Sequence, residues 1–181
     1  MTAASVFSWL DGFDAAGDGA SAKSIELVRM LIVHSPYPFS REQFTPGHLT
    51  ATACVMHPSK NSFLLIHHKR LNRWLMPGGH VETGDIDVSA SAAREAIEET
   101  GIILTSSATR LLSVDVHGIP PKGREPLHLH HDLTFLFQAS SEVVAITEET
   151  EGVVWAAECD FDKYGIAQNL RRAVGRARLE I

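Results

Sequence analysis

Apolar residues near the start of the chain recur at the spacing of an amphipathic helix. The positions that share one face of this helix are Ile25, Leu27, Val28, Leu31 and Ile32. Pro36 and Pro38 then end the helical pattern, because proline cannot continue the backbone hydrogen bonding of a helix. An earlier apolar stretch from Val6 to Phe13 favours a second, shorter helix. We therefore expect residues 1–45 to form a helical extension.

From His48 onward the pattern changes to short runs of strand-forming residues separated by turns. Residues 49–56 and 62–68 flank a turn at 57–61, which predicts that they pair as a hairpin. Further strands are expected at 109–116, 128–138 and 153–156.

Two helices interrupt or follow these strands. Residues 86–100 are rich in alanine and stop at Gly101, a typical C-terminal signal of a helix. Residues 165–177 predict a closing helix with a basic face. This order indicates an α+β fold, with one domain over residues 46–181 and the extension over 1–45 packed on it.

Composition and charge limit the classes of partner. The chain has 181 residues, of which 44% are hydrophobic and 21% charged, and a formal net charge of -6. This charge gives no general attraction to nucleic acid or to an anionic membrane, so we expect neither as a partner. The N-terminal stretch does not resemble a secretory signal, and the apolar runs are too short to span a membrane. Cys54 and Cys159 have no metal-ligand spacing, so we expect two buried thiols in a reducing, cytoplasmic protein.

Three glutamates crowd the end of the central predicted helix. Glu95, Glu98 and Glu99 stand at i, i+3 and i+4, so their carboxylates share one face and repel one another. The negative end of the helix dipole disfavours the last two further. A divalent cation would reverse both effects, and clustered carboxylates favour Mg²⁺ or Mn²⁺. Alone, however, a Glu-x-x-Glu-Glu run is usually a solvated helix face.

The surrounding residues change that interpretation, because together they resemble the signature of the Nudix hydrolases. Upstream, Trp74 to Gly79 is similar to the family's lead-in, and the likeness extends from about His48 to Trp155. The residues that match the signature itself are Gly79, Arg94, Glu95, Glu98, Glu99, Gly101 and Ile102. Asp85 stands where the signature has glutamate, eight residues rather than seven separate it from Arg94, and Ala96 replaces a larger aliphatic residue. We expect Asp85 to cap the helix instead, together with Asp87 or Ser89.

The resemblance implies an α/β/α sandwich with a mixed sheet and a pyrophosphohydrolase activity. It implies that Glu95, Glu98 and Glu99 bind Mg²⁺ or Mn²⁺, and that the chain cleaves a phosphoanhydride bond in a nucleoside diphosphate-linked or similar small molecule. Bound metal would neutralise phosphate charge and lower the pKa of its water. A homodimer is among the assemblies that the family forms.

Other residues are candidates for supporting roles. Arg94 is expected to orient the glutamates, and Gly78 and Gly79 to let the backbone approach the metal or the phosphates. The remaining candidates are Glu151 as a late base, with Glu148 and Glu149 as rivals, and Arg70, Arg73 and His80 for substrate. His128 and His130 share a face of their strand, with His131 on the opposite face. Three roles are open for this histidine group: packing beside His117, contact with substrate, or zinc binding.

Two alternatives within the fold remain open. A non-catalytic module that binds nucleotides would be expected to lack the acidic turn or to carry a DNA-binding extension. An isoprenoid-diphosphate isomerase would need a reactive cysteine, and Cys54 precedes the Trp74–Gly79 segment, which is the wrong position.

Overall fold

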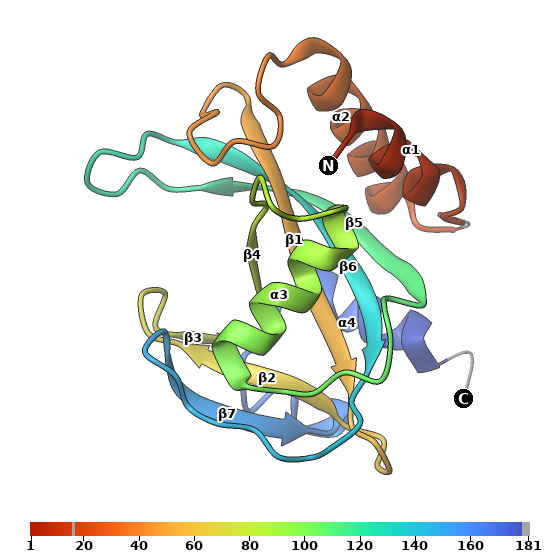
Figure 1. Ribbon diagram of the computed structural model, residues 1–181, viewed down its shortest axis with the longest axis vertical. Coiled ribbons are helices and arrows are strands. Elements are labelled where there is room, and N and C mark those ends of the chain that lie inside the picture. Colours follow the sequence, from red (N-terminus) through yellow and green to blue (C-terminus); the bar gives the residue numbers. More distant parts are fainter. Residues whose placement is uncertain (16, 179–181) are drawn as a thin grey trace.

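The computed structural model describes residues 1–15 and 17–178, which form a strongly curved mixed sheet between helices (Figure 1). The main strand order is β3-β2-β1-β6-β5, while β4 pairs with β1 and β7 with β2. The strands are β1 (Gly47–Met56), β2 (Phe63–His68), β3 (Arg73–Leu75), β4 (Gly78–His80), β5 (Arg110–Ile119), β6 (His128–Gln138) and β7 (Thr150–Ala156). β1 and β6 run parallel, and the other pairs are antiparallel.

Helices cover the sheet on both sides (Figure 1). α3 (Val88–Thr100) lies over one face, α4 (Gln168–Arg178) lies behind the other, and α1 (Ala3–Asp11) and α2 (Gly19–His34) pack beside the β5 end. A short 3₁₀ helix spans Glu158–Asp160. The α/β/α sandwich expected from the sequence is thus confirmed.

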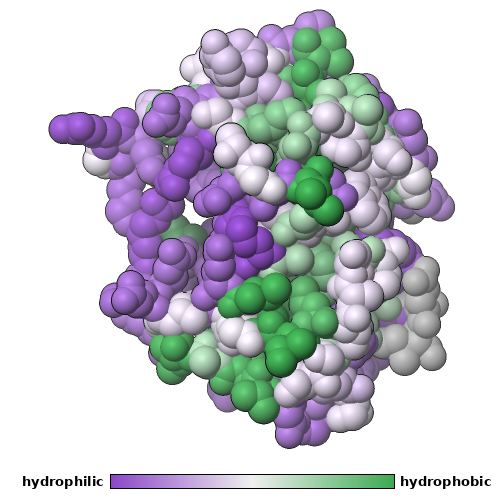
Figure 2. Space-filling model, viewed as in Figure 1, coloured by the Kyte–Doolittle hydropathy of each residue, from purple (hydrophilic) through white to green (hydrophobic). Residues whose placement is uncertain are grey.

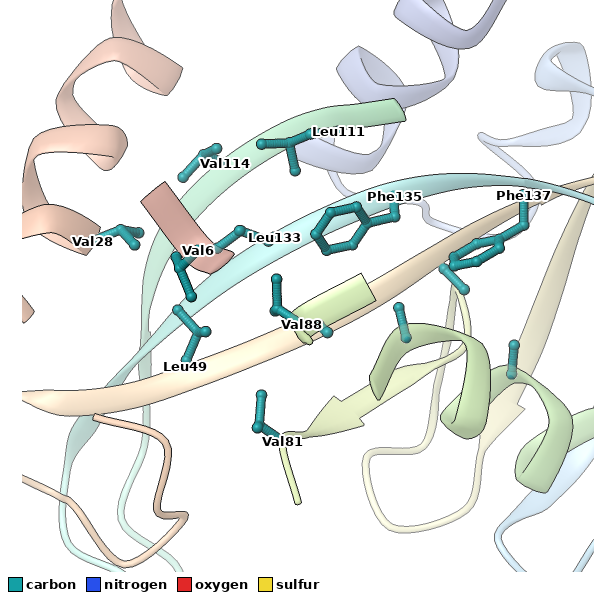
Figure 3. Close-up of a cluster of buried hydrophobic side chains, with 14 of the residues drawn as sticks. Val6, Val28, Leu49, Val81, Val88, Leu111, Val114, Leu133, Phe135 and Phe137 are labelled. Carbon is teal, nitrogen blue, oxygen red and sulfur yellow. The ribbon is translucent and has the colours of Figure 1, made fainter. Parts of the chain in front are cut away.

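Two clusters of buried apolar side chains hold these layers together. The first joins Val6 and Val28 of the N-terminal helices to Leu133 and Phe135 of β6 and to one face of α3 (Figure 3). The second packs α4 against the other side of the sheet. The N-terminal helices therefore share a core with the sheet, and Trp9 meets Phe135 edge-on with ring centroids 5.0 Å apart.

One detail of the local prediction was confirmed only in part, and another was wrong. β1 and β2 adjoin only at Met56 and Phe63, because β1 pairs mainly with β6 and β4 while β2 pairs mainly with β7. The hairpin expected from residues 49–68 is therefore limited to its turn end. Of the two thiols expected to be buried, Cys54 is buried but Cys159 is exposed. None of the described helices combines the length and apolarity needed to cross a membrane.

Candidate active site

A cleft of about 880 Å³ opens between β4, the last turn of α3 and the exposed face of β5 and β6. Figure 2 shows the hollow on this side of the molecule, bordered largely by hydrophilic residues. A second cavity of about 600 Å³, near His57 and Trp155, contains none of the residues predicted for the site. The larger cleft is therefore the candidate active site.

Local signals in the sequence place α3 against this cleft. Asp87 caps its N-terminus by accepting a 2.9 Å hydrogen bond from the Ala90 N–H, and Gly101 ends it with a φ of 64°, a conformation that favours glycine. Ala92 and Ala96 are fully buried, and α3 contacts β1. This close packing turns the opposite face of the last turn toward the cleft, so that Glu95, Glu98 and Glu99 all line it.

The Gly78–Gly79 strand passes directly against two of these carboxylates. The Gly78 N–H donates a 2.9 Å hydrogen bond to Glu99 Oε2. A Cβ on Gly79 would lie only 2.6 Å from the Glu95 carboxyl group. The pair thus brings the backbone into contact with the glutamates of the acidic turn, while its predicted approach to the metal or the phosphates stays a prediction.

Burial changes the protonation of this acidic cluster. Glu99 is only 2% exposed, and burial is the main reason that its pKa rises to about 8, despite the hydrogen bond from Gly78. Burial also raises the pKa of Glu95, against the opposing effect of the Arg94 charge. Glu98, with a side chain 57% exposed, is the most solvated of the three. The metal-free cluster is therefore electrostatically unfavourable in its fully ionised form.

Arg94 connects these carboxylates to the loop before the helix. Its Nη1 lies 3.0 Å from Glu95 Oε1 and 2.8 Å from Glu98 Oε2, and its Nη2 donates to the His80 carbonyl at 2.8 Å. Asp85 accepts from the Arg94 Nε at 3.1 Å on its other side. Arg94 is thus positioned to orient two of the three glutamates.

The role expected for Asp85 was wrong, because Asp87 alone supplies the carboxylate that caps α3. Asp85 is buried and accepts hydrogen bonds from Arg94, from Ser91 Oγ at 2.7 Å and from the Glu82 N–H at 2.9 Å. Burial acts to raise the pKa of Asp85, but these bonds outweigh it and hold the pKa below its usual value. Asp85 therefore anchors Arg94 despite the shorter side chain and the inserted residue.

The late carboxylate in the cleft is not the one preferred from the sequence. Glu151 Oε2 lies 3.3 Å from His67 Nδ1, and Glu151 is not among the described residues that line the cleft. Glu148 and Glu149 do line it, and the Glu149 charge raises the pKa of both Glu95 and Glu99. The geometry therefore favours the rival, Glu149. Its position follows from the β2–β7 pairing, where a register irregularity at His67–His68 precedes a hydrogen bond from the Lys69 N–H to the Glu149 carbonyl.

Cationic side chains line the cleft together with the acidic turn. The predicted Arg70 and Arg73 both line it, together with their neighbour Lys69. Arg41 lines it as well, and the sequence gave no reason to select that residue. Arg70 lies 3.8 Å from Glu125, and Lys122 Nζ donates to the Arg70 carbonyl at 3.4 Å. These contacts connect the β5–β6 hairpin to the loop between β2 and β3. Anionic groups entering the cleft would meet this positive charge.

Polar groups of the central strands complete the cleft. Asp132 on β6 accepts hydrogen bonds of 3.0 Å from both Thr50 and Thr52 on β1, and burial raises its pKa. His80 and His130 also line the cleft, and burial lowers their pKa to about 3 and about 2 respectively. Both rings are therefore neutral near pH 7. The sequence carried no signal for Thr50, Thr52 or Asp132, because only the parallel pairing of β1 with β6 brings them together.

Comparisons with known proteins agree with this geometry. A family model described as NUDIX domain matches residues 47–175. A MutT NUDIX hydrolase from Burkholderia pseudomallei has 26% identity and a TM-score of 0.52, covering 71% of this chain and 95% of that one. A NUDIX-family hydrolase from Clostridium perfringens has 21% identity and a TM-score of 0.52, covering 74% and 98%.

A third similar structure was solved with a ligand. The NUDIX domain of Shewanella oneidensis NrtR, complexed with ADP ribose, has 19% identity and a TM-score of 0.54, covering 83% of this chain and 96% of that one. At this identity the likeness shows the fold alone. No curated protein matches the sequence.

Proposed function

The chain belongs to the Nudix family and is a hydrolase of that type, and we propose that it cleaves a phosphoanhydride bond with the help of a divalent cation. The observation that carries this proposal is the convergence of Glu95, Glu98 and Glu99 with the Gly78–Gly79 strand in one cleft. Such a cluster costs stability without a cation, which a purely structural helix would avoid.

The donor set fits Mg²⁺ or Mn²⁺. Three carboxylates of one helical turn and Glu149 from the adjoining loop offer oxygen ligands, which hard cations prefer. The raised pKa values of Glu95 and Glu99 indicate uncompensated negative charge, which a cation would offset. Glu95, Glu98 and Glu99 would hold the ion, which supplies Lewis-acid polarisation and a lowered pKa for coordinated water.

The chain's own residues arrange the reacting groups. Arg94, held by Asp85, fixes the carboxylates of Glu95 and Glu98, so that they need little rearrangement when substrate arrives. Gly78 fixes Glu99 through its backbone N–H. Glu149 lines the cleft next to Thr150, whose Oγ1 donates to the Glu99 carbonyl, and is our candidate for the base that accepts the proton of the attacking water.

Charge in the rest of the cleft supports a small anionic substrate. Arg41, Lys69, Arg70 and Arg73 can neutralise the phosphates of a nucleoside diphosphate-linked molecule, while the overall charge of -6 opposes nonspecific binding of polyanions. A NUDIX domain of the same fold was solved with ADP ribose, so that compound is included in the test below.

The isomerase alternative receives no support from the position of Cys54. This residue is fully buried in the apolar cluster behind the sheet, and burial raises the pKa of its thiol. A thiol without access to the cleft cannot act on a substrate there.

The test is a panel of ADP ribose, a nucleotide sugar, a dinucleoside polyphosphate and a nucleoside triphosphate, incubated with the protein and Mg²⁺ or Mn²⁺. We expect phosphoanhydride cleavage of at least one class, measured as phosphorylated product by chromatography, and its loss with excess EDTA. Binding of these compounds without cleavage under either metal would reject the hydrolase and favour a nucleotide-binding module.

A further inference from the structure

A cluster of histidines lies at the end of the cleft next to β4, apart from the acidic turn. His48 on β1 is paired in register with His130 on the parallel strand β6, and His128 lies two residues earlier on the same face of β6. One ring nitrogen from each of these three residues lies within 4.8 Å of the other two. The acidic cluster and its proposed cation play no part in this arrangement.

Hydrogen bonds fix the tautomer of two of these rings. His48 Nδ1 lies 3.2 Å from the Gln43 carbonyl, and His128 Nδ1 lies 2.8 Å from the Pro126 carbonyl. A carbonyl oxygen only accepts, so Nδ1 must carry the hydrogen and Nε2 keeps its lone pair in the neutral ring. Donation from the second ring nitrogen to a carbonyl is the usual arrangement of a metal-binding histidine.

The Nε2 of His48 has no other use within the described part of the chain. His48 is only 1% exposed, and its Nε2 is buried without a hydrogen-bond partner. A buried acceptor without a partner is costly, on the order of 1–3 kcal/mol. The ring of Phe44 packs edge-on against His48 and His128, with centroids 6.5 and 5.2 Å away, and shields them from solvent.

We propose that His48, His128 and His130 form a second metal site, which binds a divalent transition-metal ion, with Zn²⁺ as the best fit. Imidazole nitrogens select zinc and its neighbours over magnesium. Tetrahedral zinc with bonds of about 2.0–2.1 Å separates its ligand nitrogens by roughly 3.3 Å, so modest side-chain rotations close the site. His130 lines the cleft, which gives the ion a path of entry and leaves a fourth position open toward it.

The histidines of this site lie on strands rather than on α3, so zinc binding can be tested independently of hydrolytic activity. Protein from which transition metals have been removed is titrated with ZnCl₂ in a calorimeter, in the presence of excess Mg²⁺. The expected result is one zinc per chain, with Mg²⁺ failing to compete because it prefers oxygen ligands. The absence of a zinc-binding step in the wild-type protein would overturn the proposal.

Variants locate the ion. His128→Asn should weaken zinc binding by more than about 100-fold, because a lost ligand costs at least as much as a lost outer-shell contact. His131→Asn, on the same strand but the opposite face, and Glu98→Gln, in the acidic turn, should both retain binding. Equal affinity of folded His128→Asn and wild type would contradict the assignment.

A measurement on the unmodified protein covers the case in which His128→Asn does not fold. Nitrogen NMR of the imidazole rings should show zinc-dependent shifts for His48, His128 and His130. His57 lies near Trp155 and lines the other cavity, so its ring should not respond. Zinc-dependent shifts confined to other histidines would reject this site.

Discussion

At the scale of single residues, Gly78 and Gly79 perform different tasks although they are adjacent. A Cβ on Gly79 would meet the end of the flexible Glu95 side chain at 2.6 Å, whereas a Cβ on Gly78 would meet the Ala51 carbonyl oxygen, also at 2.6 Å. A carboxylate can swing away from a new methyl group, but the backbone of a central strand cannot. Gly78 therefore allows the close pairing of β4 with β1, and Gly79 leaves room for the Glu95 carboxylate.

This difference predicts that alanine at one position lowers turnover and that alanine at the other lowers stability. Gly79→Ala should displace the Glu95 carboxylate and lower kcat by at least about tenfold, with a melting temperature close to that of the wild type. Gly78→Ala should instead lower the melting temperature, because the β1–β4 pairing must shift. Activity assays and thermal unfolding of both variants test this, and the reverse pattern would contradict it.

The identity of many site residues, but not their contacts, could be predicted from the sequence. The spacing of Glu95, Glu98 and Glu99 on a helix determined their common face, and the adjoining motif identified Arg94 and Gly79. Choosing Glu149 over Glu151 required the register of β7 on β2, which carries no local signal. His48 and Asp132 depend likewise on the parallel β1–β6 pairing, which joins segments far apart in the chain.

At the scale of elements, α3 combines a well-packed face with an electrostatically strained one. Its ends carry ordinary helix signals, Asp87 and Gly101, and its small buried residues fit the sheet closely. These local features explain why its limits were predicted to within two residues. The short strands β3 and β4 were missed because three residues provide too little alternation to recognise.

The strain in α3 should make the stability of the metal-free protein depend on pH. Because the folded pKa of Glu99 is raised to about 8, the folded state binds more protons than the unfolded state between the ordinary glutamate value of 4.5 and about 8. The Glu99 contribution to stability therefore falls as pH rises through this interval. The depressed pKa values of the buried histidines oppose this trend up to about one pH unit above their ordinary value of 6.5, so the Glu99 contribution is the difference between the wild type and a variant that lacks this carboxyl group. These histidines are His48, His68, His80, His130 and His131. Between pH 6.5 and 8 the Glu99 effect should amount to about 1–2 kcal/mol.

Thermal unfolding in EDTA across pH 6.5–8 measures this effect. From pH 6.5 to 8 the melting temperature of the wild type should drop by several degrees relative to that of Glu99→Gln, which cannot ionise. Added Mg²⁺ should raise the wild-type melting temperature most at pH 8, where the carboxylates are ionised. The same pH dependence of the melting temperature in the wild type and in Glu99→Gln would contradict the protonation scheme.

At the scale of the whole molecule, the N-terminal helices and the sheet share one apolar cluster. Although the family match begins only at residue 47, Val6 and Val28 are completely buried and Leu10 is 3% exposed. The sequence predicted both helices from their periodicity. It did not predict the partner strands, because amphipathicity indicates that a face is covered but not what covers it.

This shared core predicts that the extension and the domain unfold together. Leu10→Ala should lower the free energy of unfolding of the whole chain by about 2–5 kcal/mol. Val33→Ala, at a position 63% exposed on α2, should change it by less than about 0.5 kcal/mol. Chemical denaturation followed separately by far-UV circular dichroism and by tryptophan fluorescence gives both values. Two separate transitions would show that residues 1–45 fold independently.

The hydrolytic account as a whole depends on the acidic turn of α3. The most direct measurement is kcat of Glu98→Gln under saturating Mg²⁺, on whichever substrate the wild type cleaves, with Glu26→Gln on the exposed side of α2 as the matched control. The account predicts a fall of at least about 100-fold in Glu98→Gln, unchanged turnover in the control, and folding like the wild type in both. Turnover by folded Glu98→Gln equal to that of the wild type would contradict it.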